Sequence, residues 1–448
     1  MKNKHFFPLL LLLTINLFCQ ELEITLPIQN KEHTVYIGTC RDNNQDLASL
    51  VNYVLNEDFK LDGRGLIFEK TAEFLTLEKT PDEKFYTNPI WKQNRIEYVI
   101  IPSLTEDKIS FTLYNVKTAT MKTLNPVELT RNKDQQIHTL HNFSDFFMTE
   151  VYGSAGIASK KVLFSFKPYK KESEGEITHW NAEIYQTDSL GLTSKRVTFD
   201  NNYSITPEFV SDLSKSPDHE FVYVTYKQGL PQIYQGNLNG KAGKALISLR
   251  GNQLLPKVSY DGKYISFVSD ASGRSDIFIQ ELDSNFSPVG KPIQIYSGLE
   301  QTSASPHLSP DNKSMTFVTN KSGKPMSYVA DIEQTIKSRQ APQLELIETP
   351  CDECTSPSYS PDGKWITFSG SINGRRQIWL YDTKAKKAHQ LTTGGEDKEN
   401  PSFGSDSRHI VYNTTFPTTD LFILEIGQQK IRRITKGTGD KHYPSFEK

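Results

Sequence analysis

Two cysteines stand at a spacing that redox and zinc sites use. Cys351 and Cys354 are separated by two residues. A four-thiolate zinc site needs a second such pair, and Cys40 stands far away in the chain. A thioredoxin-like pair opens a helix after a strand, whereas this pair precedes Pro357 in a predicted loop. We interpret the two residues as a local disulfide or as two free thiols.

Four histidines are candidate metal ligands. His138 and His141 are three residues apart on a predicted helix, without a nearby cysteine or an acidic third ligand. His307 and His442 lie at two of the proline triplets described below, and two histidines do not complete a metal site. We therefore predict no metal site and no cofactor.

Hydrolase chemistry has two sequence signatures that this chain lacks. A serine hydrolase of the α/β type holds its nucleophile in a Gly-x-Ser-x-Gly turn, and Gly153-Ser154-Ala-Gly156 does not have that spacing. The zinc-protease pattern His-Glu-x-x-His is also absent from the sequence. These observations predict a protein that is not an enzyme.

Composition narrows the protein class. The chain has 448 residues, with 51 Lys and Arg against 53 Asp and Glu, for a formal net charge of −2. That balance argues against a nucleic-acid-binding protein, which needs a basic surplus. A mean hydropathy of −0.52 excludes a polytopic membrane protein. Aromatic residues make up 11% of the chain, which excludes a disordered one.

The first residues predict export. Lys2 and Lys4 precede an apolar run from Phe6 to Phe18. The run is shorter than the ~20 residues of a spanning helix, so we predict a signal peptide over residues 1–19 and an exported protein without a membrane span. A buried N-terminal helix and a lipidated Cys19 are the alternatives. An oxidising compartment with only four cysteines implies that a large hydrophobic core holds the chain.

The elements that must position any site come from a repeat. Five segments align, and their aspartates, Asp218, Asp261, Asp311, Asp362 and Asp406, are 43, 50, 51 and 44 residues apart. Each repeat has a turn such as Ser360-Pro-Asp-Gly, an alternating strand, a second polar turn and two further strands. Four strands at this period are typical of a β-propeller blade.

A proline triplet gives the number of blades. Pro-x-apolar triplets occur six times and are predicted to open the inner strands, at Pro207, Pro256, Pro306, Pro357, Pro401 and Pro444. A unit upstream of Pro207 has three predicted strands and lacks an inner one, which the Pro444 strand supplies. Closing the ring in this way removes exposed sheet edges. We predict six blades, from about residue 156, within a propeller domain over residues 151–448; an open β array is the alternative.

Residues 33–150 do not repeat and predict a small α/β domain. We expect strands at 33–38, 96–101 and 109–116, amphipathic helices at 46–55 and 136–151, and a short helix at 89–94. The fold class is therefore a small N-terminal α/β domain followed by a six-bladed β-propeller. Residues 20–32 form an extended segment in which Glu21 to Leu26 alternate. This segment is either the first strand of the domain or a free strand that joins a partner's sheet.

Polar segments lead into the predicted inner strands, and we call them the approach segments. In a propeller they share one face with the turns between second and third strands. Their Asn, Gln and Ser side chains suit a partner's loop or carboxylate, although each is also compatible with an ordinary solvent-facing loop. They are Tyr203-Ser-Ile, Asn252-Gln-Leu-Leu, Gln301-Thr-Ser-Ala-Ser, Glu353-Cys-Thr-Ser, Lys398-Glu-Asn and Lys441-His-Tyr.

These features together resemble the TolB family, periplasmic proteins of the Tol–Pal system of double-membraned bacteria. The resemblance covers nearly the whole mature chain. It rests on the signal peptide, the α/β domain, the Ser-Pro-Asp-Gly repeats, the helix that runs into Tyr152-Gly-Ser-Ala-Gly, and the C-terminal Pro444-Ser-Phe strand. The chain departs from the family in Asn252-Gln-Leu-Leu, which lacks a His-Asn sequence there, and in a longer stretch around residues 332–349.

The resemblance implies a monomeric adaptor without catalysis that supports outer-membrane integrity and cell division. Its propeller face would bind the peptidoglycan-associated lipoprotein Pal, and its N-terminal segment would bind TolA. By position, the TolA-directed residues are Glu21, Leu22, Glu23, Ile24, Thr25 and Leu26. The Pal-directed residues are Asn252, Gln253, Gln301, Ser303, Thr355, Ser356, Glu399, Asn400, His442 and Tyr443.

Two other functions stay open at this point. A propeller enzyme, such as a glycan lyase or a peptidase-like protein, would have clustered carboxylates or a histidine-bound metal in its channel. A solute-binding propeller would have a closed, deep polar pocket. The signal cleavage site, the redox state of Cys351 and Cys354, and any ion in the channel do not follow from the sequence.

Overall fold

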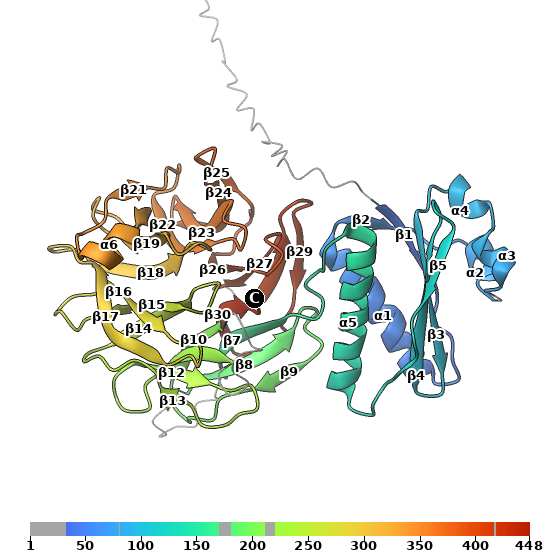
Figure 1. The fold of residues 1–448 in the computed structure, drawn as a ribbon, viewed down its shortest axis with the longest axis horizontal. Coiled ribbons are helices and arrows are strands. Elements are labelled where there is room, and N and C mark those ends of the chain that lie inside the picture. Colours follow the sequence, from blue (N-terminus) through green and yellow to red (C-terminus); the bar gives the residue numbers. More distant parts are fainter. Residues whose placement is uncertain (1–32, 80, 170–180, 211–219, 416–417) are drawn as a thin grey trace, which may run out of the picture.

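The computed structural model describes residues 33–79, 81–169, 181–210, 220–415 and 418–448. They form an N-terminal sheet with helices and six four-stranded sheets arranged in a ring (Figure 1). This confirms the predicted fold class. The predicted signal peptide and the segment 20–32 lie outside the described residues. Among the helices of the described part, none is long and apolar enough to cross a membrane.

The N-terminal sheet is mixed. Its order is β2-β1-β3-β4-β5, with β6 beside β4; β1 pairs in parallel with β2 and β3, and β3 pairs antiparallel with β4. The strands are β1 (His33–Ile37), β2 (Gly65–Ile67), β3 (Tyr98–Thr105), β4 (Lys108–Asn115), β5 (Thr120–Thr123) and β6 (Val127–Glu128).

Two long helices, α1 (Gln45–Asp62) and α5 (Lys133–Tyr152), lie between this sheet and the propeller (Figure 1). Both are longer than predicted, α1 mainly at its C-terminal end and α5 mainly at its start. Side chains cap both starts: Asn44 accepts from the Leu47 amide, and Asn132 accepts from the Gln135 amide. Both end at a left-handed glycine, Gly63 or Gly153.

Three short helices pack around the buried Trp91 on the other side of the sheet. They are α2 (Ala72–Leu77), α3 (Glu83–Tyr86) and α4 (Ile90–Gln93). Only α4 was expected from the sequence, because four to six residues are too few for a helical period.

Each of the six sheets of the ring is one blade. The first contains β30 (Asp440–Phe446), β7 (Lys161–Lys167), β8 (Glu183–Asp188) and β9 (Ser194–Arg196); the second contains β10 (Ser204–Phe209), β11 (Phe221–Thr225), β12 (Gln232–Gly236) and β13 (Lys244–Ala245). The third contains β14 (Gln253–Val258), β15 (Tyr264–Ser269), β16 (Asp276–Leu282) and β17 (Pro288–Tyr296).

The other three blades follow the same plan. The fourth contains β18 (Ser303–Leu308), β19 (Ser314–Thr319), β20 (Met326–Asp331) and β21 (Leu344–Leu346), with α6 (Glu333–Ser338) before its last strand. The fifth contains β22 (Glu353–Tyr359), β23 (Trp365–Ile372), β24 (Arg375–Asp382) and β25 (Lys387–Gln390). The sixth contains β26 (Lys398–Phe403), β27 (His409–Thr414), β28 (Leu421–Glu425) and β29 (Lys430–Arg433).

The ring closes where β30 pairs with β7. The pairing is antiparallel, from Asp440 opposite Lys167 to Phe446 opposite Val162. Phe446 is fully buried in the largest hydrophobic cluster, together with residues of α1, α5, β7 and β27. This is the inner strand that the sequence predicts to be supplied from downstream.

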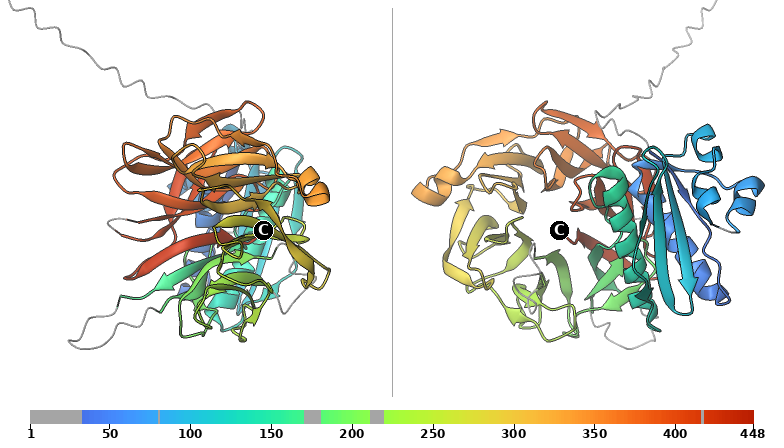
Figure 2. Two further views of the ribbon diagram at one scale, coloured as in Figure 1. Left: turned by 90° about the vertical axis from the view of Figure 1, so that its left-hand side faces the viewer. Right: turned by 45° about the vertical axis from the view of Figure 1, so that its right-hand side comes forward.

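The α/β part lies beside the ring and leaves its centre uncovered (Figure 2, right). A buried histidine links the two parts. His141 of α5 has Nδ1 2.9 Å from Asp58 Oδ2 on α1, and Nε2 3.8 Å from Asp188 Oδ1 on the propeller. Burial alone would lower the pKa of His141, but the two carboxylates outweigh it and raise that pKa to about 9.

A second buried histidine crosses the same junction. His409 Nε2 lies 2.9 Å from the Leu61 carbonyl oxygen at the end of α1, and its Nδ1 lies 2.6 Å from Asp406 Oδ2. Burial opposes its protonation, but Asp406 outweighs this and raises the pKa of His409 to about 9. Two charged imidazoles therefore hold the α/β part against the propeller at neutral pH.

We expect Phe446→Ala to open the ring seam. The change removes a fully buried aromatic side chain, so the free energy of unfolding should fall by about 3–5 kcal/mol in a denaturant titration. Ile431→Ala on the outer strand β29 is the matched control, since Ile431 is 47% exposed and should cost about 0.5 kcal/mol or less. Equal losses for both variants would contradict the role given to Phe446.

The junction histidines predict a pH dependence. A pKa raised from 6.5 to about 9 in the folded state gives stability that is complete below pH 6.5 and is lost as the pH rises to 9. The free energy of unfolding should therefore fall over this window, by on the order of 1–3 kcal/mol for each histidine. His141→Asn should flatten the pH profile, whereas His138→Asn, at an exposed position of the same helix, should not. An unchanged slope in His141→Asn would count against the charged junction.

Candidate functional site

The six prolines sit inside the inner strands, not at their starts. In each inner strand the pairing shifts register just before the proline, for example between Leu254 and Lys257 of β14. The residue before each proline has a positive φ, between 48° and 54°: Thr206, Leu255, Ser305, Ser356, Asn400 and Tyr443. We call these six residues the channel ring.

Such a conformation is uncommon for residues with a side chain, and residues before proline normally stay extended. Here each one is a β-bulge, which lets the strand pair with its neighbour on both sides of the proline while turning one side chain out of the ladder. The approach segments were expected to be loops; most of their residues lie instead in the first halves of the inner strands, because pairing continues past the bulge.

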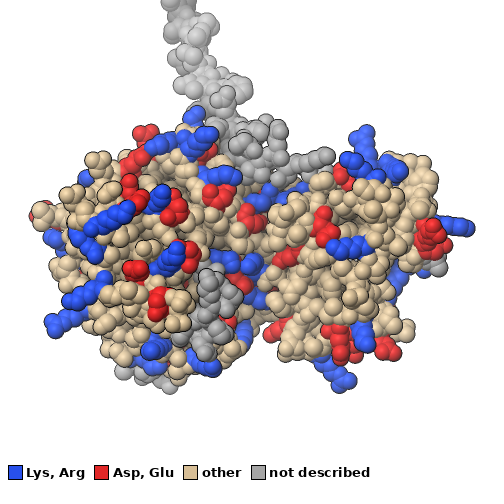
Figure 3. All heavy atoms as spheres, viewed as in Figure 1, with Lys and Arg blue, Asp and Glu red and all other residues tan. Residues whose placement is uncertain are grey.

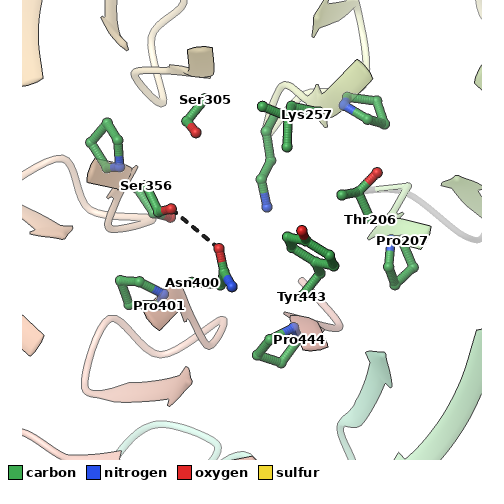
Figure 4. A pocket seen from close by; sticks show the side chains of 13 residues that line it. Thr206, Pro207, Lys257, Ser305, Ser356, Asn400, Pro401, Tyr443 and Pro444 are labelled. Carbon is green, nitrogen blue, oxygen red and sulfur yellow. Dashed lines mark hydrogen bonds between the residues drawn. The ribbon is translucent and has the colours of Figure 1, made fainter. Parts of the chain in front are cut away.

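All six channel-ring residues line one cavity at the centre of the propeller, together with prolines of five triplets, Lys257 and Ser358. The space within the cavity and its open mouth, solvent outside the mouth included, is about 500 Å³. Figure 4 shows the side chains arranged around this space, with the amino end of Lys257 directed into it.

The channel ring is mostly polar and only partly saturated with hydrogen bonds. Ser356 Oγ donates to Asn400 Oδ1 at 3.2 Å, and Asn400 Nδ2 donates to Asn413 Oδ1 at 3.0 Å. Thr206 Oγ1 is buried and has no hydrogen-bond partner among the described residues. Tyr443 adds an aromatic ring, and burial raises the pKa of its hydroxyl. Such a surface offers hydroxyls and one ring to a partner.

A second layer of polar residues lies one step further along the strands, at the middle position of each triplet. Glu208, Lys257 and His307 belong to it, together with Ser358, Ser402 and Ser445. Glu208 is 1% exposed and accepts hydrogen bonds from Lys257 Nζ at 2.7 Å and from Ser445 Oγ at 3.0 Å. Lys448 Nζ lies 2.7 Å from its other oxygen.

Two titratable groups in this layer have displaced pKa values. Burial would raise the pKa of Glu208, but Lys257 and Lys448 outweigh it and hold that pKa at about 2. Burial, reinforced by the same two lysines, lowers the pKa of His307 to about 3, so the ring of this histidine is neutral. Its Nδ1 lies 3.0 Å from the Leu308 carbonyl oxygen. Across the described residues, no cluster of three His, Cys, Asp or Glu side chains fits a metal ion.

The structure brings together part of the sequence-predicted site. Ser356, Asn400 and Tyr443 line the cavity. Five other predicted residues are half-buried at the same ends of the inner strands: Asn252, Gln301, Thr355, Glu399 and His442. Gln253 and Ser303 are buried inside their blades, and the Gln253 amide donates to the Leu249 carbonyl at 2.9 Å. Glu21 to Leu26 lie outside the described residues.

Several partners hold these side chains in place. Asn252 Nδ2 donates to Asp270 Oδ2 at 2.6 Å, and Gln301 Oε1 accepts from the Tyr296 hydroxyl at 2.6 Å. The Arg376 guanidinium lies 3.4 Å from Glu399 Oε1 and donates to Thr355 Oγ1 at 3.2 Å. These residues form the rim of the cavity, and their hydrogen bonds fix the side-chain positions without a partner.

The predicted binding residues did not include Thr206, Leu255 and Ser305 of the channel ring, although Leu255 and Ser305 belong to the approach segments. The Lys257–Glu208 pair was also missed. All five residues precede the proline of a triplet or are the middle residue of one, so the triplets used to count the blades contained their signal. The left-handed backbone before the prolines was the unexpected part.

The cysteine pair and the histidine pair are both structural here. Cys351 and Cys354 are free and buried, Cys351 just before β22 and Cys354 within it. Burial raises the pKa of the Cys354 thiol to about 12, which favours an inert thiol. His138 is exposed, whereas His141 contacts the junction carboxylates, so the two do not converge on one site.

Comparison with known proteins places the chain among named relatives. No family model matches it. The protein named TolB homolog of Protochlamydia amoebophila is 33% identical over 310 residues, which are 69% of this chain and 66% of that protein. The TolB homolog of Chlamydia pneumoniae is 32% identical over 328 residues, 73% of each chain.

A solved structure supports the fold over nearly the full length. The crystal structure of TolB from Acinetobacter baumannii superimposes with a TM-score of 0.70 and 18% identity, over 93% of this chain and 97% of that one. At this identity the likeness concerns the fold alone. The sequence identity to the two TolB homologs, extending over most of the chain, carries the assignment: this chain belongs to the TolB family.

Proposed function

We propose that this chain is a periplasmic adaptor without catalytic activity. In the proposal it binds a Pal-like peptidoglycan-associated lipoprotein through the propeller face and a TolA-like inner-membrane protein through residues 20–32, and so supports outer-membrane integrity and cell division. Membership of the TolB family supports Tol–Pal partners in general. The assignment of a Pal-like and a TolA-like partner to separate parts of the chain belongs to the proposal.

One observation carries the propeller half of the proposal. Six bulges turn six side chains into a single cavity on the channel axis. The α/β part lies to the side of the ring and does not cover this centre (Figure 2, right). A recessed centre lined by proline rings and polar side chains, with a rim of fixed side chains, is the anatomy of a protein-docking surface.

Surface charge is consistent with a protein partner. Lys and Arg side chains alternate with Asp and Glu side chains across the face shown in Figure 3. An interspersed pattern provides no continuous basic stripe of the kind that a nucleic-acid backbone requires. Specificity on such a surface comes from local shape and hydrogen bonds.

We expect Tyr443→Asn to weaken binding of the purified Pal-like domain by about tenfold or more, because aromatic rings in the centre of an interface dominate its binding energy. Asparagine tolerates the positive φ of this position, so the bulge is kept. The measurement is isothermal titration calorimetry with the full chain.

The control is Tyr264→Asn, at the start of β15 next to the turn at the opposite end of the inner strand. It should leave the affinity unchanged. An affinity equal to wild type in Tyr443→Asn, with both variants folded by circular dichroism, would exclude the channel ring as the centre of the interface.

Deletion of residues 21–26 should abolish binding of the TolA-like periplasmic domain and leave Pal-like binding intact, because the two partners are assigned to separate parts of the chain. Pull-down of each purified partner domain with the mature chain tests this. Loss of both interactions would refute the division of labour.

A further inference from the structure

Among the described residues that line the cavity there is one cation, and its amino group is directed into the open space. Lys257 follows Pro256 in β14, lines the cavity, and keeps 27% of its side chain exposed. Its Nζ lies toward the middle of the channel ring, between side chains from other blades (Figure 4). The Glu208 carboxylate holds it there at 2.7 Å, so the ammonium is positioned in advance.

The charges around Lys257 do not balance. Glu208 is a single carboxylate shared by two ammonium groups, those of Lys257 and Lys448. Lys448 Nζ also donates to the Val258 carbonyl oxygen at 2.8 Å and lies 4.9 Å from the centre of the Tyr260 ring. The main-chain oxygen of Lys448 accepts a hydrogen bond from Lys160 Nζ at 3.1 Å, so it is paired with a cation outside this group. His307 is neutral. One positive charge is left over in this group.

Hydrogen-bond donors surround that surplus charge. Thr206 Oγ1 is buried without a partner among the described residues. Ser305 and Tyr443 bring further hydroxyl groups to the same cavity. The Asn400 carbonyl oxygen, an acceptor, is already occupied by Ser356. A ligand in this cavity therefore meets proline rings and Leu255, and between them an ammonium and several hydroxyls that suit an anion.

We propose that the cavity is a recognition subsite for a carboxylate, that of an Asp or Glu side chain presented by a protein partner, with Lys257 as the group that binds it. The inference rests on the proposed function, since the partner is taken to be a protein docked on the propeller face. A carboxylate carries one negative charge and matches the single surplus cation, whereas a phosphate dianion would not be neutralised. Charge-assisted hydrogen bonds of this kind are the strong ones.

The test uses two neutral-capped tripeptides, acetyl-Gly-Asp-Gly-amide and acetyl-Gly-Asn-Gly-amide, titrated into the full mature chain and followed by ligand-observed NMR. We expect the Asp peptide to bind about tenfold more tightly than the Asn peptide. Lys257→Met should reduce the affinity for the Asp peptide to that for the Asn peptide. Lys257→Arg should retain most of the difference in affinity between the two peptides. Sodium acetate should compete with the Asp peptide but bind more weakly than it does.

Two features keep the test decisive. In Lys257→Met the buried Glu208 still has Lys448 and Ser445 as partners, so this variant should fold. If it does not fold, Lys257→Arg, which keeps the charge, provides a second measurement. Lys324→Met removes an exposed lysine, whose side chain is 61% accessible, from a turn outside the cavity. It should change the affinity for neither peptide. The inference would be overturned if the two peptides bound equally or if neither bound. It would also be overturned if acetate bound as tightly as the Asp peptide, or if Lys257→Met bound the Asp peptide as tightly as wild type.

Failure of the inference is distinguishable from failure of the proposed function. If the Pal-like domain binds wild type and Lys257→Met equally, the carboxylate subsite is refuted and the adaptor role stands. If wild type selects the Asp peptide but does not bind the Pal-like domain, the subsite stands and the assigned partner is refuted.

Discussion

The pairing of β30 with β7 is the constraint on which the rest of this structure depends. Without it, the first blade has three strands and the ring has two unpaired edges. The same strand brings Tyr443 into the channel ring, Ser445 to Glu208, and Phe446 into the cluster shared with α1 and α5. Closure of the propeller, construction of its central cavity and attachment of the α/β part are therefore one packing event, because a single strand contributes to all three.

The junction between the two parts has an unusual balance of forces. Apolar packing of α1 and α5 against β7 and β27 supplies the buried area. The polar contacts of the two imidazoles are directional and fix how the surfaces meet. A buried charge pair is costly unless its hydrogen bonds are satisfied, and here His409 contacts Asp406 on one side and a helix-end carbonyl on the other. These contacts attach the α/β part to the first and sixth blades of the ring.

Much of the architecture was readable from local pattern, and the site was readable only in part. The turn and triplet repeats report strand and blade number because each blade must repeat its own turn chemistry. The helices α1 and α5 were found by their apolar spacing, but their ends depend on the caps Asn44 and Asn132. The left-handed residue before each proline was not predictable, since Thr, Leu and Tyr before proline normally indicate extended backbone. The Glu208–Lys257–Lys448 group joins residues from three strands or segments far apart in the chain, and no local pattern indicates such a contact.

The closing seam also has a kinetic consequence. Most of the propeller sequence lies between Lys167 and Asp440, so their pairing closes a long loop and cannot form before the C-terminal segment has been synthesised. Until synthesis delivers the β30 segment, β7 lacks this neighbour, and its open edge can pair with other strands. The delay before closure therefore sets how long this edge is exposed to aggregation.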